Sequence, residues 1–296
     1  MLGEELLTRA LIGLARTLGR LPRPLMRALA HLIGWFSYLA VARRRRVAMA
    51  NLAVAFPQWS AARRAALARR HFVDFVISLI DRFALWEGPA ARIDTLVQMK
   101  GWAHLEHALK QGPVIVLAPH FLGMDAGGLC ISARIPVVSV YAQQKSQYLT
   151  EVMTRGRAKF PETALVVRNE GLRAVLRHMR RGKTLYLLPD MDLGARDAVF
   201  VPFFDVQAAT VTTVSRLARM TGAQVIPTAT RMIGNAYQLD IYPAWEDFAG
   251  HDPEEAARIM NQFIEERIRE TPSQYLWTHR RYKTRPEGAA PLYGNS

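Results

Sequence analysis

The feature that most constrains the fold is the order of strand-like and helix-like segments after residue 113. Short apolar runs rich in β-branched residues alternate there with stretches of helical periodicity. This alternation is typical of an α/β fold with a mixed, largely parallel sheet flanked by helices. The expected strands are residues 113–119, 136–141, 164–167, 184–189, 224–230 and 238–243. The expected helices are residues 124–134, 148–160, 171–181, 210–221 and 253–270, preceded by a largely helical region over residues 47–100 with Ser60 as an N-cap.

Composition excludes several classes of protein. Half of the 296 residues are apolar and 22% are charged, so the chain can bury a sizeable core and is not globally disordered. The single cysteine, Cys130, excludes intrachain disulfides and any metal site built from a cysteine cluster. A reducing compartment is consistent with this cysteine usage.

The N-terminal quarter carries most of the net charge. Residues 1–70 hold thirteen arginines, no lysine and two glutamates, and so contribute +11 of the total of +14. Residues 25–42 are apolar apart from Arg27 and His31, and four arginines follow at residues 43–46. A secretory signal would carry its positive charge before the apolar run, and the run is marginal in length for a membrane span. We predict a membrane-associated helical segment over residues 1–46 with the arginines on the cytoplasmic side, and a second domain over residues 47–296. The alternative is a helix pair buried against the body.

His120 and Asp125 follow the first expected strand of the α/β region. Working residues of parallel sheets gather just past the carboxyl ends of the strands. Five residues of regular helix would turn the two side chains apart, so they meet only if His120 lies on a turn that Gly123 helps to form. An imidazole held by a carboxylate is an oriented general base, suited to deprotonating an alcohol. Spacing alone leaves this prediction and a structural histidine equally open.

Further candidates lie at the other strand ends. Asp190 and Asp192 follow the strand at residues 184–189 and could bind Mg²⁺, position nearby cations or cap a solvated turn. Arg157, preceded by Gly156, and Arg168 suit phosphate binding, although a surface role is the commoner fate of an arginine. The apolar run at residues 199–204 is either core or the lining of an acyl-chain channel, with Phe203 and Phe204 as candidates.

The C-terminal residues 275–286 interleave aromatic and cationic side chains. The same side chains bind nucleic acids or a phosphorylated lipid headgroup, and the basic, membrane-seeking N-terminus favours the lipid. The chain contains neither G-x-S-x-G nor H-E-x-x-H, and Arg177 stands where a phosphate-binding loop ending at Gly182-Lys183-Thr184 needs its first glycine.

Taken together, these segments resemble the late acyltransferases of lipid A biosynthesis, the lauroyl/myristoyl acyltransferase family of the glycerolphosphate acyltransferase superfamily. The resemblance extends over nearly the whole chain. It rests on HFLGMD, TRGRAKF, LLPDMDLG, VFVPFFDV and YLWTHRRYKTRPEG, which begin at residues 120, 154, 187, 199 and 275.

The resemblance implies transfer of an acyl group from acyl carrier protein to a hydroxyl of a phosphorylated glycolipid, at the cytoplasmic face of the bacterial inner membrane. His120 matches the base of the family and Asp125 its carboxylate partner, which is often a longer glutamate. Gly156, Arg157 and Asp190 match site residues, whereas Arg168 and Asp192 match less closely. No metal, cofactor or nucleic acid is expected. The alternatives are a related acyltransferase acting on a lysophospholipid or another glycolipid, and a non-catalytic membrane protein that binds lipid or nucleic acid.

Overall fold

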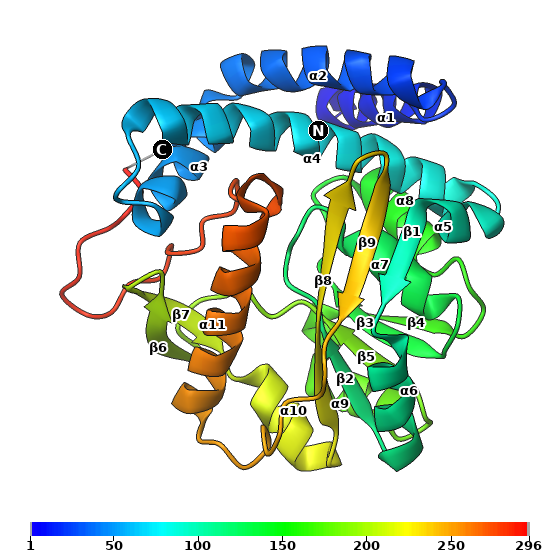
Figure 1. Cartoon of the computed structure of the whole chain (residues 1–296), viewed down its shortest axis with the longest axis vertical. Helices are drawn as coiled ribbons and strands as arrows, with labels where there is room; N and C mark the ends of the chain where they lie inside the picture. The colour runs from blue at the N-terminus through cyan, green and yellow to red at the C-terminus, as the bar shows by residue number, and fades with distance from the viewer. Residues whose placement is uncertain (1, 295–296) are drawn as a thin grey trace.

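A seven-stranded sheet forms the centre of the protein (Figure 1). The computed structural model describes residues 2–294. The strands of this sheet are β1 (Val97–Lys100), β2 (Val114–Leu117), β3 (Val137–Tyr141), β4 (Thr163–Val167), β5 (Thr184–Leu187), β8 (Gln224–Ile233) and β9 (Ala236–Ile241). They follow the order β1-β9-β8-β2-β5-β3-β4, and only the pair β8 and β9 is antiparallel. The predicted mixed, largely parallel α/β fold is confirmed.

Helices cover both faces of the sheet. Helices α5 (Ala91–Leu96), α6 (Trp102–Gln111), α7 (Met124–Ser132) and α8 (Gln147–Arg157) lie on one face. Helices α9 (Gly171–Met179), α10 (Thr213–Thr221) and α11 (Pro253–Glu270) lie on the other face, with the short turns η1 (Arg168–Glu170) and η2 (Pro272–Gln274) beside them. Strand β2 explains this arrangement, because Val114 and Val116 point into one core while Ile115 and Leu117 point into the other. A strand buried on both faces reads as the continuous apolar run seen in the sequence.

The six predicted strands occur, and three further strands were not predicted. β1 is a short edge strand in a region predicted to be helical, and its alternate residues are exposed. Strands β6 (Ala198–Phe203) and β7 (Val206–Val211) form a separate hairpin, which delays the start of α10 to Thr213. Phe204 and Asp205 make its two-residue turn with φ of 49° and 62°. Asp205 is a usual turn residue, but Phe204 is not, and the turn contains no glycine, so the apolar run at residues 199–204 gave only a weak hairpin signal.

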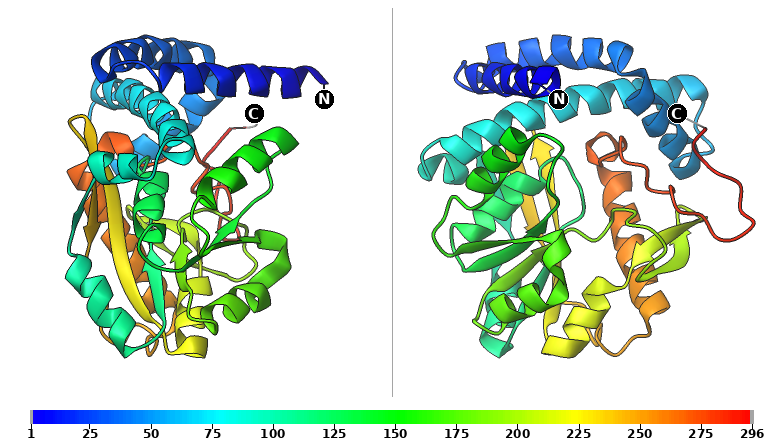
Figure 2. Two further views of the ribbon diagram at one scale, coloured as in Figure 1. Left: turned by 90° about the vertical axis from the view of Figure 1, so that its right-hand side faces the viewer. Right: turned by 180° about the vertical axis from the view of Figure 1, so that it is seen from behind.

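Four N-terminal helices form a layer over one end of the sheet (Figures 1 and 2). They are α1 (Leu2–Leu18), α2 (Arg23–Ala40), α3 (Ala42–Ala55) and α4 (Ala61–Glu87). Ser60 caps α4 as predicted, since its Oγ accepts a hydrogen bond from the Arg63 amide at 3.2 Å. Among the described helices, none alone has the length and apolar character to cross a membrane. Helices α2 and α3 reach that length and apolar character only when they are taken together, and the chain bends by 90° between them. The expected division between residues 46 and 47 falls within α3 and stays a prediction.

Helix α2 packs unusually closely on α4. Met26, Ala30 and Gly34 form its buried stripe at a spacing of four residues. A Cβ atom at Gly34 would lie 2.5 Å from the Val73 Cα, so only glycine permits this approach. Gly13, on α1, has open space around the position of a Cβ.

We expect Gly34→Ala to destabilise the protein by about 1–3 kcal/mol, because the added methyl group meets the backbone of α4 and forces the helices apart. Gly13→Ala is the matched control. It should be neutral or stabilise by up to about 1 kcal/mol, since alanine is the better helix former. Urea denaturation of both variants measures the difference, and equal free energies of unfolding would contradict the close-packing argument.

Candidate functional site

Two neighbouring strands bring His120 and Asp190 together. β2 pairs in parallel with β5, Leu117 beside Leu187, and the Ala118 amide extends the pairing by donating to the Leu187 carbonyl at 2.9 Å. The two chains leave the sheet at the same edge. His120 follows β2 by three residues and Asp190 follows β5 by three residues, so their side chains meet there.

The carboxylate of Asp190 holds His120 through both its ring and its backbone. His120 Nδ1 lies 2.7 Å from Asp190 Oδ1, and the His120 amide donates to Oδ2 at 2.9 Å. An ionised carboxylate only accepts hydrogen bonds, so Nδ1 carries the proton and Nε2 is left as the basic nitrogen. The imidazole is 15% exposed and the carboxylate is fully buried. This is the geometry of an oriented general base.

Electrostatics keep Asp190 ionised. Burial by itself raises the pKa of this carboxyl, but the charge of His120, their hydrogen bonds and the charge of Arg281 outweigh it, so the pKa of Asp190 lies below its ordinary value. Tyr275 lies close by, and burial together with the Asp190 charge raises the pKa of this phenol well above its ordinary value. Asp190 is therefore anionic and Tyr275 neutral at physiological pH.

The expected contact between Asp125 and His120 is replaced by ion pairs with two arginines. Asp125 Oδ1 lies 2.7 Å from Arg157 Nε, and Oδ2 lies 2.9 Å from Arg82 Nε. Asp125 sits in the first turn of α7, where the helix dipole favours a negative charge. Burial raises the pKa of Asp125, but the two guanidinium charges outweigh it and the pKa lies below its ordinary value. The sequence separation was therefore a poor guide to the partner of His120.

Gly123 does not serve the role that the sequence suggested. Its φ of −82° is open to any residue, so no glycine is needed for the turn itself. A Cβ atom at Gly123 would lie 2.7 Å from the Thr230 carbonyl oxygen, and one at Gly127 would lie 2.1 Å from Thr230 Oγ1. These two glycines let α7 lie directly on β8, which fixes the position of Asp125.

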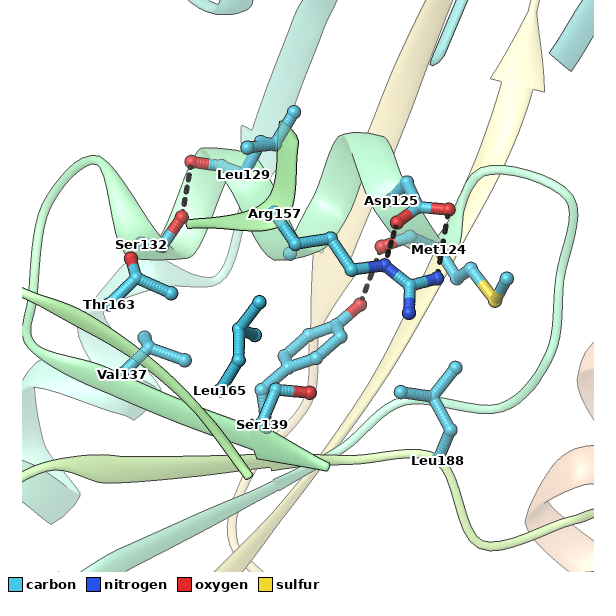
Figure 3. Close-up of a pocket in the computed structure, with 12 residues that line it drawn as sticks. Met124, Asp125, Leu129, Ser132, Val137, Ser139, Arg157, Thr163, Leu165 and Leu188 are labelled. Atoms are coloured by element: carbon cyan, nitrogen blue, oxygen red, sulfur yellow. Dashed lines mark hydrogen bonds and ion pairs between the residues drawn. The ribbon is translucent and has the colours of Figure 1, made fainter. Parts of the chain in front are cut away.

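The next predicted pair, Gly156 and Arg157, ends helix α8. A Cβ atom at Gly156 would lie 2.3 Å from the Trp86 ring, so this residue is a packing contact between α8 and α4. That close packing brings Arg157 to Asp125 (Figure 3). Gly156 thus allows α8 to pack on α4, and Arg157 contributes its side chain to the site.

An apolar cavity opens beside this ion pair (Figure 3). It lies between α7 and strands β3, β4 and β5, and its empty space of about 440 Å³ includes open solvent. Its lining residues are Met124, Asp125, Gly128, Leu129, Ser132, Val137, Ser139, Arg157, Thr163, Leu165, Tyr186 and Leu188. The buried Tyr186 hydroxyl donates to the Met124 carbonyl at 2.8 Å. An apolar cavity with charged groups at one side suits an acyl chain.

The expected channel lining at Phe203 and Phe204 is wrong. Both rings are buried in the core on the opposite face of the sheet, where Phe203 packs on Tyr275 and Tyr282. The apolar run at residues 199–204 is therefore core. The actual cavity residues are spread over five segments, so no single local pattern in the sequence marks the cavity.

Asp192 holds the C-terminal segment in place. Its Oδ1 accepts from the Thr284 hydroxyl at 2.7 Å, its Oδ2 accepts from the Thr284 amide at 2.6 Å, and its own amide donates to His279 Nε2 at 3.0 Å. Arg168, the other weaker candidate, is exposed at the carboxyl end of β4. Asp192 is thus a buried structural contact two residues from Asp190, and Arg168 is free to meet a partner.

The C-terminal segment buries most of its aromatic side chains and one arginine, which therefore do not face a headgroup, whereas Lys283 is exposed. Tyr275, Trp277, Arg281 and Tyr282 are all buried. The Arg281 guanidinium donates to the Ala209 carbonyl at 2.8 Å and to Thr210 Oγ1 at 2.9 Å. The interleaved pattern therefore reflects a C-terminal strap, residues 275–286, that packs its aromatic rings around one buried cation and leaves its other cations partly or fully exposed.

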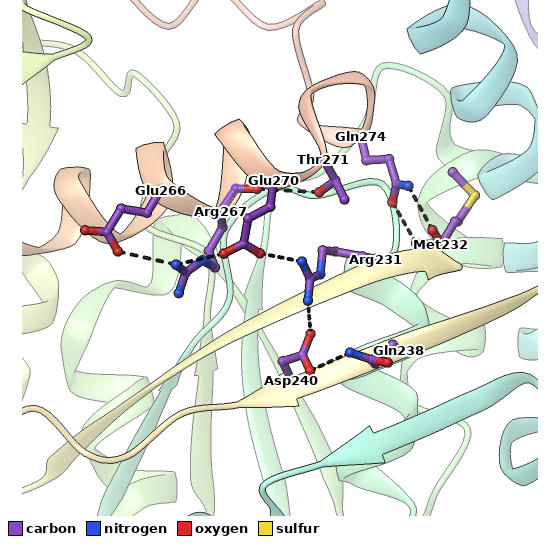
Figure 4. Close-up of polar contacts among 9 residues, drawn as sticks. All are labelled: Arg231, Met232, Gln238, Asp240, Glu266, Arg267, Glu270, Thr271 and Gln274. Atoms are coloured by element: carbon purple, nitrogen blue, oxygen red, sulfur yellow. Dashed lines mark hydrogen bonds and ion pairs between the residues drawn. The ribbon is translucent and has the colours of Figure 1, made fainter. Parts of the chain in front are cut away.

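The C-terminal strap reaches the site because Gln274, just before it, is hydrogen-bonded to β8 (Figure 4). Gln274 accepts from the Met232 amide at 2.6 Å and donates to the Met232 carbonyl at 2.9 Å. Arg231, on the same strand, pairs with Asp240 and with Glu270 at the end of α11. The chain then passes His120, whose carbonyl accepts from the Leu276 amide at 3.0 Å.

Sequence reasoning also missed Arg82. It lies within a long helix among apolar residues, where a charge reads as a solvated face, yet its side chain is only 15% exposed. The apolar residues on either side of it, Ile80 and Phe83, were the available signal in the sequence. Among residues 2–294, no group of three or more histidine, cysteine or acidic side chains is arranged to hold a metal ion.

Comparison with known proteins identifies the class of enzyme. The family model described as bacterial lipid A biosynthesis acyltransferase matches residues 4–284. The chain belongs to this family, and it is an acyltransferase of lipid A biosynthesis, as the resemblance implied.

Relatives in Escherichia coli (strain K12) match over most of both chains. The lipid A biosynthesis palmitoleoyltransferase is 33% identical over 280 residues, which cover 93% of this chain and 90% of the relative. The lipid A biosynthesis lauroyltransferase is 31% identical over 287 residues, which cover 95% of this chain and 93% of the relative. The lipid A biosynthesis myristoyltransferase is 28% identical over 297 residues, which cover 98% of this chain and 90% of the relative.

Burial of the His279 imidazole makes the stability of the fold sensitive to acid. Burial, followed by the charge of His120, lowers the pKa of His279 from 6.5 to about 4. Below pH 6.5 the unfolded chain takes up a proton that the folded chain excludes, so stability should fall by about 2 kcal/mol between pH 6.5 and pH 4. Urea denaturation at pH 7 and pH 4.5 should show this loss in the wild type and a smaller loss in His279→Asn, which retains an acceptor. Equal losses in the two proteins would exclude His279 as a source.

Proposed function

We propose that the protein transfers a fatty acyl group from acyl carrier protein to a hydroxyl of a phosphorylated lipid A precursor, with His120 as the general base. The observation that carries this proposal is the His120–Asp190 pair at the carboxyl edge of the sheet, which the apolar cavity reaches at Leu188 and Asp125. Leu188 and Asp125 line the cavity, Leu188 lies two residues before Asp190, and the His120 charge acts on Asp125. A base and an acyl-chain slot are therefore neighbours.

The proposed reaction needs no covalent enzyme intermediate. His120 Nε2 takes the proton of the acceptor hydroxyl, and the oxygen attacks the thioester carbonyl. The tetrahedral intermediate then collapses with cleavage of the carbon–sulfur bond. The imidazolium returns its proton to the departing thiolate, so the products are an ester and a thiol. Asp190 fixes the tautomer of His120 and stabilises the imidazolium while it exists.

Arg157 has a separate role in the proposal. Its guanidinium lines the cavity, and together with Arg82 it leaves one net positive charge on the buried trio with Asp125. A fixed cation in a water-poor site stabilises negative charge that develops on a reacting oxygen. We assign Asp125 to the positioning of Arg157, in place of the role as partner of His120 that the sequence suggested.

The base assignment predicts how two variants behave. His120→Ala should lower kcat by about 10²–10⁴-fold, the usual contribution of general-base catalysis. Asp190→Asn should lower kcat and also move the acidic limb of the kcat/KM profile to lower pH, because the imidazolium loses its carboxylate. Acyl transfer measured between pH 5 and pH 9 tests both.

Asp192→Asn is the matched control, since Asp192 is buried two residues away and holds Thr284. It should lower the stability and leave the acidic limb in place. If Asp190→Asn and Asp192→Asn had the same pH profile, the positioning role of Asp190 would be refuted. Near wild-type turnover by His120→Ala would refute the base.

The acyl donor is proposed to dock through charge. Acyl carrier proteins are acidic, and Arg168 and Arg173 are exposed where β4 ends and α9 begins, at the same edge of the sheet as His120. The strand β4 supplies Thr163 and Leu165 to the cavity. A cationic rim beside the cavity would speed the encounter with an acidic donor.

We expect kcat/KM for the acyl carrier protein donor to fall about tenfold or more between 50 and 500 mM salt, because salt screens exposed charges. A small neutral acyl thioester should show little dependence. Charge reversal in Arg168→Glu/Arg173→Glu should raise KM for the carrier donor only, whereas Arg258→Glu, an exposed arginine on α11, should not. Rates with the carrier that are indifferent to salt would contradict this docking.

The proposed location is the cytoplasmic face of the bacterial inner membrane, where the acceptor is a membrane lipid. The runner-up acceptor is a lysophospholipid or another glycolipid. Offering a lipid A precursor and a lysophospholipid to the detergent-solubilised enzyme with labelled donor separates the two. Preference for the lysophospholipid would overturn the acceptor and leave the chemistry intact.

A further inference from the structure

Arg281, on the C-terminal strap, is a buried charge that is bonded only to neutral groups. Its side chain is 2% exposed. The guanidinium donates to the side-chain oxygen of Asn261 at 3.3 Å, in addition to Ala209 and Thr210, and lies 4.9 Å from the centre of the Phe203 ring. Among residues 2–294, all of its hydrogen-bond partners are uncharged and its Nε has none. A buried charge is costly unless an opposite charge offsets it, so the counter-charge of Arg281 lies beyond these contacts.

The hydrogen bonds of Arg281 do not by themselves require a cation. Ala209 and Thr210 lie on β7 and Asn261 lies on α11, so the side chain ties the strap to two other elements. A neutral amide side chain could donate to the same carbonyl and hydroxyl oxygens without the cost of a buried charge. Packing therefore does not explain why the side chain at this position is charged.

The strap holds Arg281 close to the carboxylates that follow β5. The amide of Asp192 donates to His279 Nε2 at 3.0 Å, and its carboxylate accepts from the Thr284 amide at 2.6 Å. These two strap residues stand on either side of Arg281 in the chain. Asp190 lies two residues before Asp192, and the charge of Arg281 acts on its buried carboxyl.

The other ionisable groups around this centre do not supply the counter-charge. Burial lowers the pKa of one imidazole to about 4 and raises the pKa of three phenols, which keeps four neighbouring groups neutral at physiological pH: His279, Tyr275, Tyr282 and Tyr293. Two further acids, Asp125 on α7 and Glu265 on α11, already pair with other arginines. Asp190 and Asp192 remain as the buried anions that Arg281 can balance.

We propose that Arg281 is a positioning residue that balances the charge of Asp190 and thereby sets the pH range in which His120 acts as a base. The role deepens the proposed function and its catalytic part rests on it. Asp190 alone would favour the imidazolium form of His120 strongly, because it places a buried negative charge beside the ring. The guanidinium offsets part of that charge, so the imidazole stays neutral and able to accept a proton at lower pH.

Two substitutions separate the charge of Arg281 from its packing. Arg281→Gln removes the charge and keeps a hydrogen-bond donor, whereas Arg281→Lys keeps the charge. We expect the acidic limb of the kcat/KM profile, measured between pH 5 and pH 9, to move by about one unit to higher pH in Arg281→Gln and to stay in place in Arg281→Lys. A purely structural residue would lower turnover in both variants without moving the limb, and that result would overturn the proposal.

A double-mutant cycle tests the charge balance without acyl transfer. Arg281→Gln and Asp190→Asn are compared singly and together by urea denaturation at pH 8. The second substitution removes a charge that the first has left unbalanced. The equilibrium constant for unfolding of the double variant should therefore be about tenfold smaller than the two separate effects predict. Asp125→Asn in place of Asp190→Asn is the matched control and should be additive, since Asp125 has two arginines of its own.

Additive effects of Arg281→Gln and Asp190→Asn would overturn the charge balance. Coupling of Arg281→Gln to Asp192→Asn alone would also overturn it, because the charge would then serve only to hold the strap. If Arg281→Gln does not fold by itself, recovery of folding in the double variant is the expected coupling, and a double variant that stays unfolded while Asp190→Asn folds would contradict it. Coupling in a protein that transfers no acyl group would instead refute the proposed function alone.

Discussion

The contact between His120 and Asp190 joins two strands that are neighbours in the sheet but 70 residues apart in the chain. A buried carboxylate is costly unless it is paired and hydrogen-bonded, and here the ring and the amide of one histidine supply both. The cost of leaving Asp190 unpaired therefore fixes the turn after β2, the tautomer of His120 and the direction of its basic nitrogen. The rest of the site is arranged around that fixed nitrogen.

A second buried carboxylate organises the other side of the site. Asp125 brings together Arg82 from α4 and Arg157 from α8, so that three helices meet at one charge cluster. Glycines make this possible, because Gly127 lets α7 lie on β8 and Gly156 lets α8 lie on α4. The result is a cation held at the wall of an apolar cavity. The two aspartates thus have different roles. Asp190 orients the proposed base, His120, and Asp125 positions the guanidinium of Arg157.

The N-terminal layer and the C-terminal strap connect the surface of the molecule with this centre. Asn51 links α3 to the strap, and the strap links to the backbone of His120 and, through Thr284, to Asp192. These contacts are hydrogen bonds between buried or half-buried groups, so a displacement of α3 would also displace the proposed base, His120. An enzyme of lipid A biosynthesis has reason to couple these regions, because its acceptor is itself a lipid.

Local sequence determined much of this protein. The continuous apolar run at residues 113–119 predicted a strand buried on both faces, and the structure contains it. The N-terminal helices were predicted from the cap at Ser60, the helical spacing of the apolar residues after it and the apolar stripes near the N-terminus. Position at a strand end also singled out His120, Asp125 and Asp190. These features depend on residues close together in the chain, where spacing carries the information.

Partners were decided only by tertiary structure. Five residues separate His120 from Asp125 and 70 separate it from Asp190, yet the order of the strands gives His120 to Asp190 and leaves Asp125 to two arginines. The cavity, the buried Arg281 and the packing role of Gly156 have the same origin. Each is made by elements from distant parts of the chain, and no local pattern encodes which strand lies beside which.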